Sequence, residues 1–190
     1  MKHALAISAL TLCTALPAAA QDGALLPAAA ASVPRTNVET FLTAHGGLLV
    51  KDFYEVGSVS GDGRVDLYAI VFRAPGNEQV QVRGLRVEVI GSGKPAPADS
   101  RYLDADEIEA LSRGLKYMAD VAAQWKGMEK QEYTEIDFTA KDGLRIGFYQ
   151  RRKSQGAFVS AGEAQVLLEA KDLARLQALA DDALRILRGQ

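Results

Sequence analysis

The strongest constraint on the fold is a hairpin pattern that occurs twice in the chain. Residues 53–56 (FYEV) reappear as residues 133–136 (YTEI), and the turn signal Asp62-Gly63 reappears 80 positions later. Asp-Gly between two strand-like segments is typical of a tight hairpin turn. A pattern repeated at one fixed spacing indicates a supersecondary unit that is used twice.

A helix start is repeated in the same way. Residues 103–108 (LDADEI) return 65 positions later as residues 168–173 (LEAKDL). In the first copy, Asp104 and Glu107 stand three residues apart, as in a capping box, directly before an apolar run. Each copy then continues with an apolar stripe at helical spacing. The stripes contain Ile108, Leu111, Leu115, Met118, Ala122 and Trp125 in the first copy, and Leu173, Leu176, Ala180, Ala183 and Leu187 in the second.

The segment before the first long helix has strand patterning with turn signals. Residues 65–73 are apolar on both faces, which predicts a central strand covered on both sides. The apolar positions change face at Gly84, which predicts a β-bulge there. Residues 91–101 are rich in Gly, Pro and Ser and predict a loop. Earlier in the chain, Thr36 and Asn37 predict the cap of a short helix.

Together these patterns predict an α+β fold. We expect two copies of a strand-strand-strand-helix unit, residues 48–126 and 132–188, with an antiparallel sheet packed on two long amphipathic helices. Hydrophobic residues make up 48% of the chain, which suffices for a sizeable core. Both copies are therefore expected within a single domain that spans residues 36–190.

The amino terminus has the order of a secretory signal peptide. Lys2 precedes an apolar run, and Ala18 and Ala20 supply the small residues of a cleavage site. The run is shorter than the ~20 apolar residues that cross a bilayer, so no membrane span is expected. We expect cleavage to remove residues 1–20, residues 21–35 to form a flexible lead, and the mature protein to be periplasmic or secreted.

The mature chain has no cysteine, because Cys13 lies in the expected signal peptide. A lipid anchor on Cys13 is the alternative, although Leu12 stands where lipoprotein signals carry a small residue. His45 is then the one remaining histidine. Disulfides, zinc sites of cysteine and histidine, and thiol nucleophiles are excluded together, and no metal or cofactor is expected.

The net charge argues against a nucleic-acid partner. Without Lys2, the chain carries 21 basic and 24 acidic side chains, a net charge of −3 with histidine neutral. Domains that bind nucleic acids instead show a strong basic excess. Nucleic acid is therefore not the partner we expect.

Two phrases of the sequence resemble those of uncharacterised exported bacterial proteins. These phrases are residues 102–108 (YLDADEI) and residues 143–148 (GLRIGF). In the order of its elements, the chain is also similar to the single-strand-binding Whirly and PUR-type repeats, over most of residues 48–188 and without a shared motif. The resemblance to exported proteins implies an exported domain and brings no known activity.

One strand and the turn after it combine basic and aromatic side chains. Such interleaving is how proteins grip single-stranded nucleic acids and other polyanions. Because the chain is expected outside the cytoplasm, an anionic envelope component or an acidic protein is the expected partner. The candidate ligand-binding residues are Arg145, Phe148, Tyr149, Arg151, Arg152 and Lys153.

Acidic residues offer a different interpretation. Glu135 and Asp137 share one strand face and could act as the acid and base of a hydrolase. A second acidic group could in principle hold calcium but lacks the spacing of a calcium loop, and the start of a helix explains Asp104, Asp106 and Glu107. This second group contains Asp99, Asp104, Asp106 and Glu107.

The sequence therefore favours an exported, non-enzymatic binding or structural module of the periplasm or cell envelope. A carboxylate-dependent hydrolase acting on envelope material is the alternative. The third interpretation is a protein that binds polyanions or single-stranded nucleic acid through the basic-aromatic hairpin. We assign no catalytic residue from the sequence.

Overall fold

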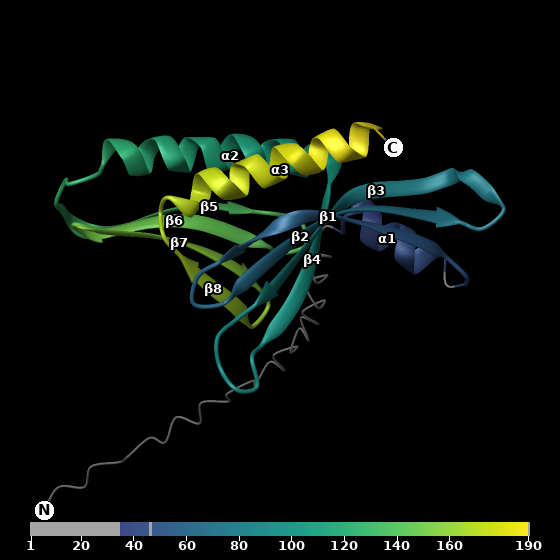
Figure 1. The fold of residues 1–190 in the computed structure, drawn as a ribbon, viewed down its shortest axis with the longest axis horizontal. Helices are drawn as coiled ribbons and strands as arrows, with labels where there is room; N and C mark the ends of the chain where they lie inside the picture. Colours follow the sequence, from purple (N-terminus) through teal and green to yellow (C-terminus); the bar gives the residue numbers. More distant parts are fainter. Residues whose placement is uncertain (1–34, 46, 190) are drawn as a thin grey trace, which may run out of the picture. The chain divides into compact units, whose positions relative to one another are not determined.

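A computed structural model describes residues 35–45 and 47–189. The expected signal peptide with its cleavage site and Cys13, and the lead up to residue 34, lie outside the described residues. The fold is α+β, as predicted (Figure 1). In place of the one antiparallel sheet that was expected, the described part of the chain forms two antiparallel four-stranded sheets, together with three helices. No helix among these residues is long and apolar enough to cross a membrane.

The first sheet is an antiparallel meander in which each strand pairs with the next. It contains β1 (Val50–Ser60), β2 (Arg64–Ala74), β3 (Asn77–Ile90) and β4 (Ala98–Asp104), and helix α2 (Ala105–Gln124) follows.

The predicted loop at residues 91–101 is therefore too long. Its last residues begin β4, which pairs with β3 from Ile90 opposite Ala98 to Gly84 opposite Asp104. The first half of the chain thus has four strands before its helix, and the prediction of three was wrong. β4 is short and mostly half-buried, so it lacks the apolar alternation by which the other strands were found.

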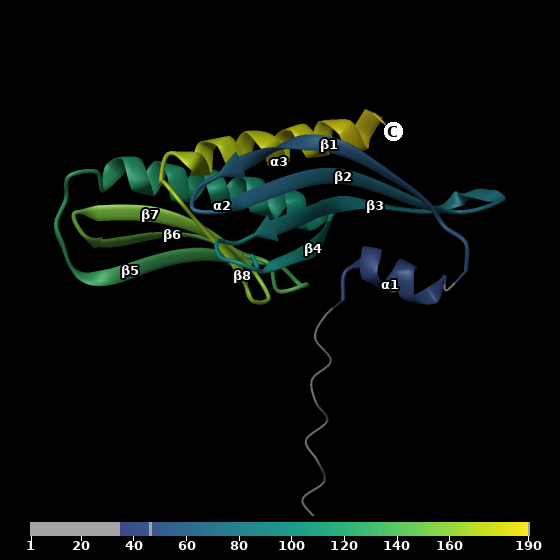
Figure 2. The same cartoon turned by 60° about the horizontal axis from the view of Figure 1, so that its bottom comes forward.

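The second sheet has the same order. It contains β5 (Lys130–Thr139), β6 (Arg145–Arg152), β7 (Ser154–Ala161) and β8 (Ala164–Leu168), and helix α3 (Asp172–Gly189) follows. In both Figure 1 and Figure 2, α2 and α3 lie side by side along the sheets.

One core cluster contains the apolar stripes of both long helices and the inward-facing residues of both sheets. Leu111 of α2 and Leu176 of α3 are buried in it, together with Val87 of β3 and Phe148 of β6. The predicted start of α2 is correct, since the backbone N–H of Asp104 donates to the Glu107 carboxylate at 3.1 Å. Burial of such stripes is the main source of helix stability in a domain of this kind.

The expected bulge at Gly84 is not present. β3 pairs with β2 without interruption from Gln81 to Ile90. The apolar side chains of β3 change face because the two faces of the strand pack against different elements. Val82 lies on the face that packs near helix α1 (Asn37–Ala44), whereas Leu85 lies on the face that belongs to the main core. As predicted, β2 is an inner strand with both faces buried.

Two aspartates link the sheets to each other. Asp142, in the β5–β6 turn, accepts a hydrogen bond from the backbone N–H of Tyr102 in β4 at 2.8 Å. Asp62, in the β1–β2 turn, accepts one from the backbone N–H of Leu167 in β8 at 2.7 Å. In each case, an aspartate from the first turn of one sheet binds the last strand of the other sheet.

Candidate functional site

The six predicted site residues do not form one site. Phe148 has no exposed surface and packs in the core, with its ring centroid 6.0 Å from that of Trp125. Its side chain points to the opposite face of β6 from its neighbour Tyr149, because successive side chains of a strand alternate. Phe148 is therefore removed from the candidate site.

Arg145 begins β6 and is occupied by acidic partners. Its guanidinium donates to Glu135 at 2.9 Å and to Asp137 at 3.2 Å. The same group lies 5.5 Å from the ring centroid of Phe158. The hydrogen bond and charge of Asp137, followed by the charge of Glu135, raise the pKa of Arg145. Arg145 is thus part of a paired network and is removed from the site as well.

The remaining predicted residues lie together around the β6–β7 turn. Tyr149, Arg151 and Arg152 line a shallow hollow of about 590 Å³. Gln131 and Tyr133 of β5 complete its lining, and sequence reasoning missed both of them. The strand alternation that places Tyr133 on the same face as Glu135 was the signal that could have found one of them.

Two stacked tyrosines form the aromatic part of the hollow. The rings of Tyr133 and Tyr149 have centroids 6.0 Å apart and planes inclined by 25°. Tyr149 lies directly across Gly156 of β7, where a Cβ atom would overlap the phenol ring. Tyr133 is 55% exposed, and its hydroxyl donates to Glu135. That hydrogen bond is the main reason that the pKa of Tyr133 rises to about 12, so the phenol stays neutral.

The basic part of the hollow has unsatisfied charge. The guanidinium groups of Arg151 and Arg152 are exposed and make no hydrogen bond or ion pair with any residue that the structure describes. Lys153, at the turn itself, is 3.6 Å from the Glu129 carboxylate, and both side chains are well exposed. An exposed pair of this kind contributes little to stability.

Trp125 adjoins this region without lining the hollow. It caps the carboxyl end of α2, is half-buried and packs against the core. The Lys130 ammonium lies over its ring, 3.6 Å from the centroid. Lys130 also pairs with Arg152 across β5 and β6, so this cation–π contact holds a further positive charge beside the two arginines.

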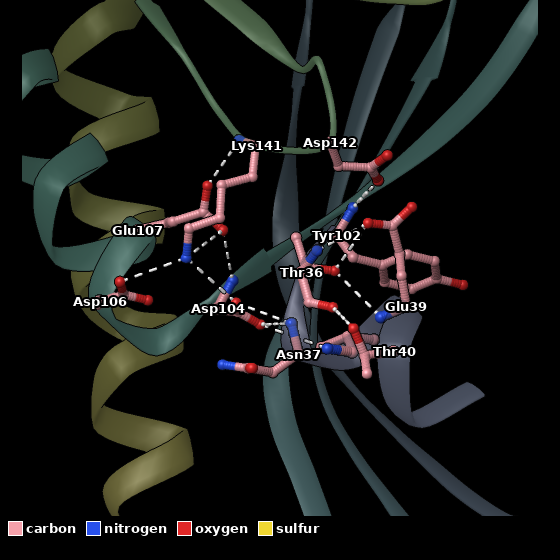
Figure 3. Close-up of polar contacts among 11 residues, drawn as sticks. Thr36, Asn37, Glu39, Thr40, Tyr102, Asp104, Asp106, Glu107, Lys141 and Asp142 are labelled. Atoms are coloured by element: carbon pink, nitrogen blue, oxygen red, sulfur yellow. Dashed lines mark hydrogen bonds and ion pairs between the residues drawn. The ribbon is translucent and has the colours of Figure 1, made fainter. Parts of the chain in front are cut away.

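The acidic group at the start of α2 is satisfied by the protein itself (Figure 3). Both Asp104 carboxylate oxygens accept from the backbone N–H of Asn37 at 2.9 Å, which ties α1 to the start of α2. The Lys141 ammonium lies 3.4 Å from Asp104 and from Asp106, and 3.8 Å from Glu107. Among the described residues, no group of acidic, histidine or cysteine side chains is arranged to hold a metal ion. This cluster therefore has a structural role: it joins α1, the start of α2 and the β5–β6 turn, and is called the structural joint below.

Asp142 stands beside that joint in an unusual environment. Its burial and the neighbouring Glu39 carboxyl raise the pKa of Asp142 to about 6. The backbone N–H of Tyr102 and the guanidinium of Arg101, 3.8 Å away, act in the opposite direction. Figure 3 shows Asp142, Tyr102 and Glu39 converging from the β5–β6 turn, β4 and α1. The carboxyl is therefore partly protonated near pH 6.

Comparison with known proteins gives no family. No family model matches this chain, and no curated protein sequence is significantly similar to it.

Proposed function

We propose that this chain is an exported, non-enzymatic binding module of the periplasm or cell envelope, and that it takes an anionic ligand in the hollow at the β6–β7 turn. One observation carries the proposal: two exposed arginines, Arg151 and Arg152, lack partners among the described residues beside the stacked rings of Tyr133 and Tyr149. Unpaired guanidinium groups bind carboxylates and phosphates in a forked geometry. The signal-peptide pattern of residues 1–20 supports the location.

We also propose that the chain consists of two copies of one strand-and-helix unit, whose sheets pack on the two long helices. The reciprocal bonds of Asp62 and Asp142 support it, because these residues occupy corresponding positions in the repeated hairpin. The copies differ on their outer faces. Helix α1 packs on the first sheet through Val38, whereas the second sheet leaves Tyr133 exposed to a ligand.

The hydrolase alternative receives less support from the geometry. Glu135 and Asp137 both accept hydrogen bonds from the one guanidinium of Arg145. Glu135 also accepts the Tyr133 hydroxyl, and Asp137 accepts that of Thr139 at 3.1 Å. A general acid or base must contact the reacting group of its substrate, and these two carboxylates are instead engaged by donors of the protein itself. We therefore favour binding over hydrolysis.

The binding proposal is tested with anionic polymers. The Arg151→Ala/Arg152→Ala double variant should bind polygalacturonate or polyphosphate at least about tenfold more weakly than the unmodified protein, because each charge-assisted hydrogen bond contributes about 1.5–3 kcal/mol. Isothermal titration calorimetry at two salt concentrations measures the loss. Binding should weaken as salt rises, since the contacts are exposed ion pairs.

The matched control removes the same charge elsewhere. Arg113 and Arg175 are exposed arginines of α2 and α3, so the Arg113→Ala/Arg175→Ala variant should retain the affinity of the unmodified protein. An equal loss in both double variants would mean that only the total charge matters. Failure of the unmodified protein to bind either polymer would contradict the proposed function.

A further inference from the structure

We infer that the ligand of this hollow is a short acidic saccharide, with one sugar ring on the exposed face of Tyr133 and its carboxylate or phosphate on Arg151 and Arg152. This inference rests on the proposed function and specifies the class of ligand. It follows from three properties of the hollow: a fixed aromatic surface, a small number of available cations, and an acidic boundary.

The aromatic surface is held in place from two sides. Tyr149 lies against the backbone of β7, because Gly156 leaves room for its ring. Tyr133 stacks on Tyr149 and is anchored at its hydroxyl by Glu135. A ring fixed in this way offers a flat, electron-rich face to the partly positive C–H groups of a pyranose. Little conformational entropy is lost when such a preorganised surface binds.

The positive charge around the hollow is local. Residues 126–133 and 149–156 carry five basic and two acidic side chains, whereas the chain as a whole is acidic. Within this group, Lys130 lies over Trp125 and Lys153 lies near Glu129. The fifth basic residue, Lys126, lines a different hollow beside α2 and the start of α3. Among the residues that line the hollow itself, Arg151 and Arg152 are therefore the cations available for an anion, enough for one or two negative groups.

Acidic side chains bound the hollow along β5. Glu135 lies two residues beyond Tyr133 on the same face, and Asp137 lies two residues further. A long polyanion that continued along the sheet would meet these two carboxylates, whose charge the single guanidinium of Arg145 neutralises only in part, and like charges close together repel each other. Single-stranded nucleic acids need a positive groove that follows many phosphates, so they fit the hollow poorly.

The test compares four ligands by calorimetry on the purified protein. Tri-galacturonate should bind, and its affinity per site should lie within about threefold of that of polygalacturonate, because one short stretch fills the hollow. Neutral maltotriose should bind at least tenfold more weakly, since it lacks the carboxylates. A twenty-residue oligothymidylate should also bind at least tenfold more weakly per site. Tight oligothymidylate binding, or affinity that grows steadily with polymer length, would overturn the inference.

A pair of glycine variants tests the stacking itself. The Gly156→Ala substitution should push the Tyr149 ring from its place and lower tri-galacturonate affinity about fivefold or more. Gly147→Ala is the matched control, because it displaces the ring of Phe158 on the same sheet but outside the hollow. The affinity for tripolyphosphate, an anion without a ring, should stay unchanged in both variants.

These outcomes separate the inference from the proposed function. If the arginine variants lose all anion binding while Gly156→Ala binds tri-galacturonate normally, the anion site stands and the saccharide assignment is wrong. If the unmodified protein binds none of the anions, both are wrong. Circular dichroism spectra of each variant establish that a lost affinity is not a lost fold.

Discussion

Replacing Phe148 with alanine is expected to destabilise the protein by about 3–5 kcal/mol, the range observed for fully buried phenylalanines. The ring has no exposed surface and fills the core between β6 and the end of α2, where it meets Trp125. Its removal takes away the transfer free energy of the ring and leaves a cavity that the close-packed helices and sheets refill only in part. A urea titration followed by circular dichroism measures the loss.

The control is Phe53→Ala, on the first sheet. Phe53 is 46% exposed and packs edge-on against Phe72, so its removal should cost about 1 kcal/mol or less. The folded fraction of Phe148→Ala should bind anions with unchanged affinity, because the ring faces away from the hollow. An unaltered urea midpoint together with lost binding would return Phe148 to the ligand site.

Replacing Asp142 with asparagine is expected to stabilise the protein by about 2 kcal/mol at pH 8 and to have little effect near pH 4. A pKa of about 6 in the folded protein, against an ordinary value of 3.8, means that ionising Asp142 costs the folded state about 3 kcal/mol of stability. Screening by solvent reduces this cost, so we expect a gain of about 2 kcal/mol when the charge is removed. The folded state holds this proton more tightly than the unfolded state does. The protein is therefore fully stable with respect to this group below pH 4, where the carboxyl is protonated, and it loses stability as the pH rises through about 6 and the carboxyl ionises. Asparagine keeps an oxygen for the Tyr102 N–H.

Urea titrations at pH 4.5, 6 and 8 follow the difference between variant and unmodified protein. The matched control is Asp62→Asn at the corresponding turn, where the aspartate accepts from the Leu167 N–H at an exposed position. That substitution should bring no gain at pH 8. A gain for Asp142→Asn that is the same at all three pH values would contradict a role for its ionisation.

Local signals in the sequence are sufficient to predict the helices and most of the strands. Asp104 and Glu107 mark the start of α2 because a capping box needs only four residues of context. β4 was missed because pairing with β3, a contact between distant segments, makes it a strand. The change of face at Gly84 was seen, but its cause lies in α1, which packs on β3 from more than forty residues earlier.

The candidate site was predictable only in part. Arg151 and Arg152 were found because they are adjacent in the sequence, whereas Gln131 and Tyr133 come from β5 and join them through the pairing of strands. The basic-aromatic pattern also contains Phe148, which is next to Tyr149 in the sequence but lies on the opposite face of β6, because successive residues of a strand face opposite sides. The partners of Arg145 also depend on register, which a single sequence does not determine.

The two aspartate bonds between the sheets have a consequence for the order of folding. Until the β5–β6 turn is in place, the Tyr102 amide of β4 lacks the acceptor that Asp142 provides. Until β8 is in place, the Asp62 carboxylate lacks its donor, Leu167. These contacts join residues 40 and 105 positions apart, so neither half of the chain can complete its hydrogen bonding before the other. The two sheets should therefore gain protection from hydrogen exchange together, at the Tyr102 and Leu167 amides, as one cooperative unit.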